Sequence, residues 1–101
     1  MITDTQSIPK GLQFAVLRAV STLGRDAYGA ALAHNLSTKA KQPVQVAKVY
    51  TALARLDAKG LLSTRQESVS GRGHPRKVYS LTQDGKRALE AGLRFYGMGN
   101  G

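Results

Sequence analysis

The 101-residue sequence contains no cysteine, no tryptophan and only six acidic residues. Without cysteine the chain has neither a disulfide framework nor a thiolate metal site, and nothing in it demands an oxidising compartment, so we expect a cytoplasmic protein. The two histidines, His34 and His74, stand far apart in the sequence and without paired carboxylates, so no metal site is expected. The chain also lacks a nucleophile elbow and phosphate-binding or dinucleotide-binding glycine loops. We therefore expect neither enzymatic activity nor a cofactor.

Long apolar runs are missing as well. The most apolar region, residues 12–23, is interrupted by polar side chains and is shorter than the ~20 residues that a membrane-spanning helix needs. Residues 1–10 lack the basic start and the apolar segment of a secretory signal. These absences predict no membrane partner.

Positive charge is what the chain has in excess. Fifteen Lys and Arg residues give a net charge of +9, and residues 39–77 carry +7 of it, with only Asp57 and Glu67 on the acidic side. A basic segment attracts nucleic acid, because neutralised phosphates release counterions. An anionic membrane surface would also attract it, but the segment lacks the Trp or Phe anchors of interfacial helices. We therefore expect nucleic acid as the partner, and double-stranded DNA given the fold that the sequence predicts.

The hydrophobic pattern predicts one domain over residues 1–96 and a disordered tail over residues 97–101. Glycines at 24 and 60 and Pro43 mark helix ends, and Thr82 caps a final helix. Alternating residues on either side of a Gly/Pro/Arg turn predict a hairpin. Helices are expected at 9–23, 28–40, 45–59 and from 83 onward, and strands at 61–69 and 77–81. This order, α-α-α-β-β-α, is mostly α with a small β hairpin and is typical of a winged helix-turn-helix.

The third helix occupies the place of a recognition helix. Its apolar residues fall on one stripe, which we expect to be buried: Val46, Val49, Tyr50, Leu53 and Leu56. The candidate DNA-binding residues on the remaining surface are Gln45, Lys48, Thr51 and Arg55. An ordinary solvated helix face is the alternative, but residues 45–56 include no acidic side chain, whereas surface helices usually mix both signs. Tyr50 lies at the edge of the stripe, where its hydroxyl can face water, a carbonyl or a phosphate.

The hairpin tip supplies a second group of candidates. Arg72, Arg76 and Lys77 flank a turn whose glycines let the backbone approach a DNA groove. A flexible solvated turn is the alternative, and for His74 the two interpretations are equally supported.

A second apolar face on the first helix has two interpretations. Phe14 and Leu17 project away from the stripe of the same helix that we expect to face the core. Either another helix of the chain or a partner subunit covers them.

The motifs taken together resemble those of the PadR family of bacterial transcriptional regulators. The resemblance covers about residues 12–93 and rests on Tyr28-Gly29, residues 49–62, Gly71-Arg72, residues 76–79 and residues 81–89. It implies a homodimeric winged helix-turn-helix that binds a pseudo-palindromic operator, commonly as a repressor, and that a small-molecule inducer often releases. By position, Lys48, Tyr50 and Thr51 would enter the major groove and residues 72–77 would form the wing.

The chain departs from this family in lacking the long C-terminal helical region of many members. A dimer would then need other surfaces, and the candidate interface residues are Phe14, Leu17, Leu89, Leu93, Phe95 and Tyr96. Two other functions compete, because a fold does not fix a function: a protein-interaction module and a sensor with an aromatic-lined ligand cavity.

Overall fold

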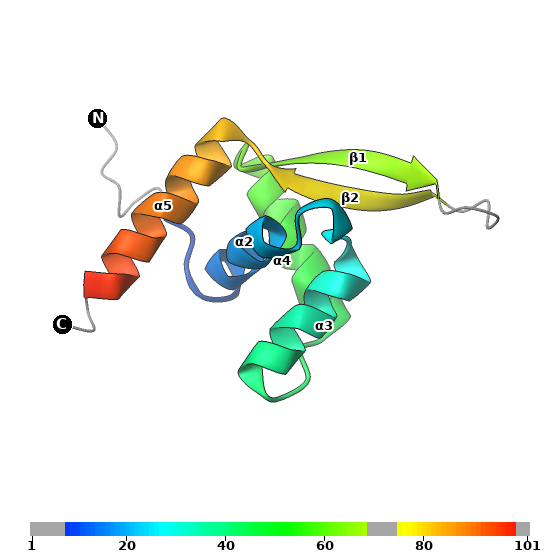
Figure 1. Cartoon of the computed structure of the whole chain (residues 1–101), viewed down its shortest axis with the longest axis horizontal. Helices are drawn as coiled ribbons and strands as arrows, with labels where there is room; N and C mark the ends of the chain where they lie inside the picture. Colours follow the sequence, from blue (N-terminus) through cyan, green and yellow to red (C-terminus); the bar gives the residue numbers. More distant parts are fainter. Residues whose placement is uncertain (1–7, 69–74, 99–101) are drawn as a thin grey trace.

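A computed structural model describes residues 8–68 and 75–98 of the chain (Figure 1). Three helices, a hairpin and a fourth helix follow one another, with a short 3-10 helix after the first. The elements are α2 (Gly11–Leu23), η1 (Gly24–Asp26), α3 (Gly29–Ala40), α4 (Val46–Ala58), β1 (Leu62–Ser68), β2 (Pro75–Leu81) and α5 (Gln83–Met98). The predicted winged helix-turn-helix order is confirmed.

The helix ends follow the local chemistry of the sequence. Gly24 adopts a φ of 55° after α2 and donates its N–H to the carbonyl of Val20. Gly60 follows α4 with a φ of 78°, a left-handed conformation that glycine adopts without a Cβ penalty. The beginning of α2 differs from the prediction, because Pro9 lies before the helix and Lys10 is its extended N-cap.

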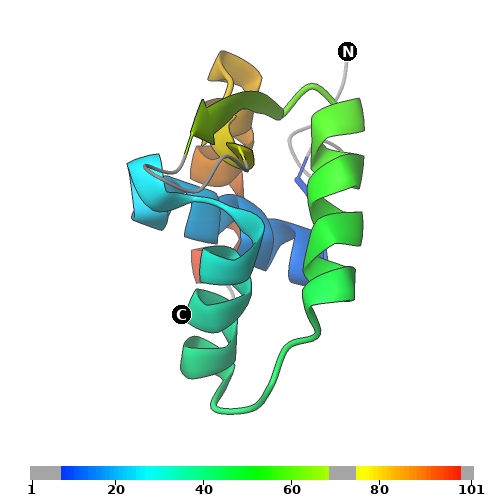
Figure 2. The same cartoon turned by 90° about the vertical axis from the view of Figure 1, so that its right-hand side faces the viewer.

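Helix α2 lies at the centre of the fold and packs against α3, α4, β2 and α5 (Figures 1 and 2). Its buried residues are Val16, Leu17, Ala19 and Val20. Leu17 is completely buried inside the chain, so the expectation that it belongs to a dimer interface is wrong. A centrally placed helix has neighbours on several sides, which explains why its second apolar face is also covered.

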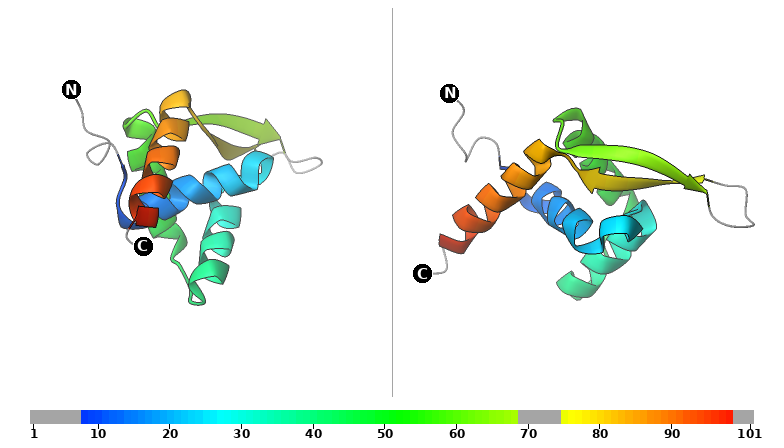
Figure 3. Two further views of the ribbon diagram at one scale, coloured as in Figure 1. Left: turned by 60° about the vertical axis from the view of Figure 1, so that its left-hand side comes forward. Right: turned by 45° about the horizontal axis from the view of Figure 1, so that its top comes forward.

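The first turns of α2 are crossed by α5 (Figure 3). The rings of Phe14 and Tyr96 lie 4.9 Å apart, and the Tyr96 hydroxyl donates to the Pro9 carbonyl at 3.1 Å. Gly92 faces the Phe14 ring so closely that no Cβ would fit there. Another helix of the chain therefore covers much of Phe14, although the residue is only partly buried.

The hairpin is antiparallel, with Leu62 opposite Leu81 at its base and Ser68 opposite Pro75 at the end of the described pairing. It is fastened to the body by the bridge between Tyr28 and Val78 and by the Tyr79 N–H, which donates to the Ala27 carbonyl at 2.8 Å. These bonds fix the angle at which the hairpin leaves the helices.

The base of the hairpin is joined to α5 by Thr82. Its hydroxyl donates to the Gly60 carbonyl at 2.7 Å and accepts the Gly85 N–H at 3.0 Å, as an N-cap residue does. The helix continues to Met98, so it includes two residues that we expected in the tail; residues 99–101 lie outside the described part. None of the helices described is long and apolar enough to span a bilayer.

The contact between α5 and the turn that joins α4 to β1 predicts an unusual response to alanine. A Cβ at Gly85 would collide with the backbone carbonyl of Leu61, whereas a Cβ at Gly97 of the same helix meets nothing. Gly85→Ala should therefore lower the free energy of unfolding by about 1–3 kcal/mol, although alanine favours helices. Gly97→Ala should leave it unchanged or raise it by up to about 1 kcal/mol. Urea denaturation of both variants checks this, and equal stability would contradict the tight contact.

Candidate nucleic-acid interface

Helix α4 presents a row of small side chains to solvent. Its buried residues, Val49, Ala52, Leu53 and Leu56, hold it against the core. The opposite face carries Ala47, Thr51, Ala54 and Ala58, all exposed. The Thr51 hydroxyl donates to the Ala47 carbonyl at 3.0 Å, so its hydrogen is used within the helix. Because these exposed side chains are short, the helix backbone can come close to a surface such as the major groove.

Two residues of the predicted buried stripe are half exposed. Val46 and Tyr50 retain 45% and 49% of their accessible surface. By helical spacing both lie toward the edge of the helix surface that faces the core. The expectation that the whole stripe is buried is wrong for these two positions.

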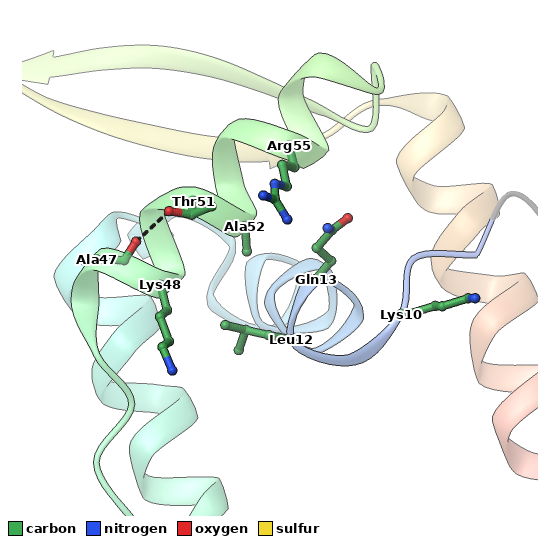
Figure 4. Close-up of a pocket in the computed structure, with 8 residues that line it drawn as sticks. All are labelled: Lys10, Leu12, Gln13, Ala47, Lys48, Thr51, Ala52 and Arg55. Carbon is green, nitrogen blue, oxygen red and sulfur yellow. Dashed lines mark hydrogen bonds between the residues drawn. The ribbon is translucent and has the colours of Figure 1, made fainter.

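One flank of the exposed face is basic. Lys48 and Arg55 lie about two turns apart on it, beside the beginning of α2 (Figure 4). They line a hollow of about 340 Å³ together with Lys10, Leu12, Gln13, Ala47, Thr51 and Ala52. Arg55 and Gln13 extend toward one another in this view, and the Gln13 side chain also accepts a hydrogen bond from Lys59 at 2.7 Å. The arrangement provides cations and an amide next to the small-residue row, as recognition of phosphates and base edges requires.

The other flank of α4 joins the hairpin and α3. The Tyr50 ring covers Gly29 in the first turn of α3, where no Cβ would fit. Burial raises the pKa of the Tyr79 hydroxyl on β2, and the nearby Tyr50 and Asp57 add to that rise. Tyr50 therefore fixes the position of α4 relative to α3 and the hairpin, while its exposed surface stays beside the small-residue row.

The hairpin divides its basic residues between two faces. The Arg76 guanidinium stacks on the Tyr28 ring at 3.9 Å from the centroid, so part of its surface is used within the chain. Lys77 follows Arg76 and, by strand alternation, shares the face of Tyr79, which lies near α4. Arg72 and His74 lie outside the described residues.

The structure thus brings three predicted residues, Lys48, Thr51 and Arg55, to one exposed surface of α4, and Gln45 is exposed at the N-cap of the helix. Gln13 joins them and was missed, because its proximity depends on how α2 packs against α4. The only sign of this role in the sequence is that Gln13 is a polar residue within the most apolar region, residues 12–23. Within residues 8–68 and 75–98, no cluster of His, Asp or Glu is suited to hold a metal ion.

Comparison with known proteins identifies one matching family. The model of the transcriptional regulator PadR-like family matches residues 16–91. No curated protein sequence matches the chain.

Several solved structures are similar to the chain. A PadR family transcriptional regulator from Eggerthella lenta is 30% identical, covers 88% of this chain and 80% of its own, and gives a TM-score of 0.65. A PadR-like transcription factor from Bacteroides fragilis is 26% identical over 88% of this chain and 82% of its own, with a TM-score of 0.72. PadR from Bacillus subtilis, solved in complex with operator DNA, is 22% identical over 83% of this chain and 47% of its own, with a TM-score of 0.67, and supports the fold alone.

Because Arg76 and Lys77 lie on different faces of the hairpin, we expect their replacement by alanine to have different effects. Arg76→Ala should lower the free energy of unfolding by about 0.5–2 kcal/mol, because it removes the guanidinium from the Tyr28 ring. Lys77→Ala should change stability by less than about 0.5 kcal/mol and should weaken binding to duplex DNA. Urea denaturation and fluorescence anisotropy measure the two effects, and a stability loss larger for Lys77→Ala would contradict the assignment of faces.

Proposed function

The chain belongs to the PadR-like family of transcriptional regulators, and from this premise we propose that it is a sequence-specific repressor that binds a pseudo-palindromic operator as a homodimer in the cytoplasm. Proteins of this family regulate transcription and are not enzymes. The proposal rests above all on one observation: the exposed face of α4 combines a row of small side chains with a basic flank.

In the proposed complex α4 enters the major groove. The row of Ala47, Thr51 and Ala54 allows the close approach, and methyl groups at these positions suit contact with thymine methyls. Lys48 and Arg55 are long enough to reach phosphates or the acceptors of guanine from the flank of the helix. Gln45, at the helix N-terminus, supplies an amide to the same groove.

The hairpin acts as the wing in this proposal. Lys77 faces the α4 side and supplies phosphate affinity, together with Arg72 and His74, which we retain on sequence grounds. Arg76, which the sequence also places on the wing, has a structural role in this proposal: stacked on Tyr28, it holds the far half of the hairpin to the start of α3. A hairpin held in place loses less conformational freedom on binding.

The homodimer is proposed to form through the apolar side of α5. Leu93, Phe95 and Tyr96 remain 44%, 46% and 41% exposed, although Tyr96 also bonds to Pro9, and Leu89 is partly buried next to them. Such a group of exposed apolar side chains at one end of a helix is typical of an interaction surface. To bind two half-sites, such a dimer has to present its two α4 helices about one helical turn of DNA, roughly 34 Å, apart.

A charge-matched pair of variants tests the proposed use of α4. A duplex selected from random sequence by the wild-type chain serves as the operator, and a scrambled duplex serves as the reference. Lys48→Gln should weaken operator binding about tenfold and reduce the preference over the scrambled duplex. Arg94→Gln removes the same charge from the polar face of α5 and should change affinity by less than about twofold. Loss of affinity in equal measure for the two variants would mean that only net charge matters.

Another pair tests the dimer. Phe95→Ser should shift the chain toward monomer in sedimentation velocity and flatten the cooperativity of operator binding, because it removes an exposed aromatic anchor. Arg94→Gln, its neighbour on the polar face, should sediment as the wild type does. If Phe95→Ser keeps the wild-type association state, the dimer does not form through this end of α5.

A further inference from the structure

A second hollow lies away from α4. It has a volume of about 350 Å³ and is lined by residues of α2, η1, β1, β2 and α5, with none from α3 or α4. In Figure 2, η1 and α4 lie on opposite sides of the molecule. The hollow is therefore separate from the surface proposed to bind DNA.

Three cationic side chains from different segments meet at this hollow. Arg25 comes from η1, Arg65 from β1 and Lys86 from α5, and no acidic residue of the described part of the chain lines it. Holding three like charges around one concavity costs free energy unless a counter-charge is present. Arg65 has a partial counter-charge in Glu67, whose carboxylate lies 2.9 Å from one terminal nitrogen of the guanidinium. The other nitrogens of this fork are left for another acceptor.

The remaining lining is suited to a ligand that is only partly polar. Ser21 and Ser80 add hydroxyl groups, and the Ser80 hydroxyl lies 3.2 Å from that of Ser63. Val20 and Leu81 form an apolar part of the wall. The volume is at the small end of the range for ligand pockets, about 300–1,000 Å³.

We propose that this hollow binds a small organic anion. Its carboxylate or phosphate group would be held by Arg25, Arg65 and Lys86, and its apolar body would rest on Val20 and Leu81. Guanidinium groups suit this task, because their planar forks pair with such anions in a bidentate manner. A bound anion would link the base of the hairpin to α2 and α5, since its partners come from all three regions.

Phenyl phosphate is a suitable probe, and calorimetric titration of the full chain without DNA measures its binding. Saturable binding with one molecule per chain is expected. Inorganic phosphate should bind more weakly because it lacks the apolar body, and benzyl alcohol should not bind because it lacks the charge. Absence of saturable phenyl phosphate binding, or equal affinity for inorganic phosphate, would overturn the proposal.

Charge-matched variants locate the site. Arg25→Gln and Lys86→Gln should each raise the Kd for phenyl phosphate about tenfold, whereas Arg94→Gln on the same helix as Lys86 should raise it by less than about twofold. All three side chains are exposed, and circular dichroism verifies that the variants fold. Lys48→Gln tests whether phenyl phosphate binds at the α4 surface instead of the hollow. If this variant weakens binding as much as Lys86→Gln does, the anion binds at α4 and the proposed site is wrong. Because no DNA is present, these results do not depend on the proposed regulatory function.

Discussion

The burial of α2 on several sides is the constraint on which the rest of this structure depends. Val16, Leu17 and Val20 are almost completely removed from solvent, and four other elements supply the surfaces that cover them. Burying such side chains stabilises the fold by roughly 1.5–3 kcal/mol each. Because α3, α4, β2 and α5 must all reach this helix, their relative positions are set by it. The exposed faces of α4 and α5 are what remains after the central helix has been covered.

Close contacts at glycines then set how the outer elements meet. Gly29 admits the Tyr50 ring between α3 and α4, and Gly85 admits the Leu61 carbonyl between α5 and the turn that joins α4 to β1. The stack of Arg76 on Tyr28 joins the hairpin to the start of α3. These contacts lie around the margins of the proposed DNA surface rather than on it. They hold the α4 face and the hairpin in a fixed relative position, which is needed if both elements are to contact DNA at the same time.

The parts of the fold predictable from sequence were those decided locally. Gly24 and Gly60 end helices, and Thr82 caps α5, because each acts through its own backbone or hydroxyl group. Lys48 and Arg55 could be placed on the exposed face of α4 from helical spacing alone. The burial of Leu17, the exposure of Val46 and the stacking of Arg76 could not, since each depends on which element packs nearby. The same limit hid Gln13, which reaches α4 only through the tertiary packing of α2.

The central claim is that the small-residue face of α4 lies in the major groove. The chain has no cysteine, so a single introduced thiol can carry a DNA-cleaving iron chelate at one chosen position. Ala54→Cys, on the α4 face, should cut a bound operator in two short clusters about one helical turn apart. Ala30→Cys, exposed on α3, should cut weakly and without a defined position. Diffuse cutting from Ala54→Cys, or sharper clusters from Ala30→Cys, would contradict the account.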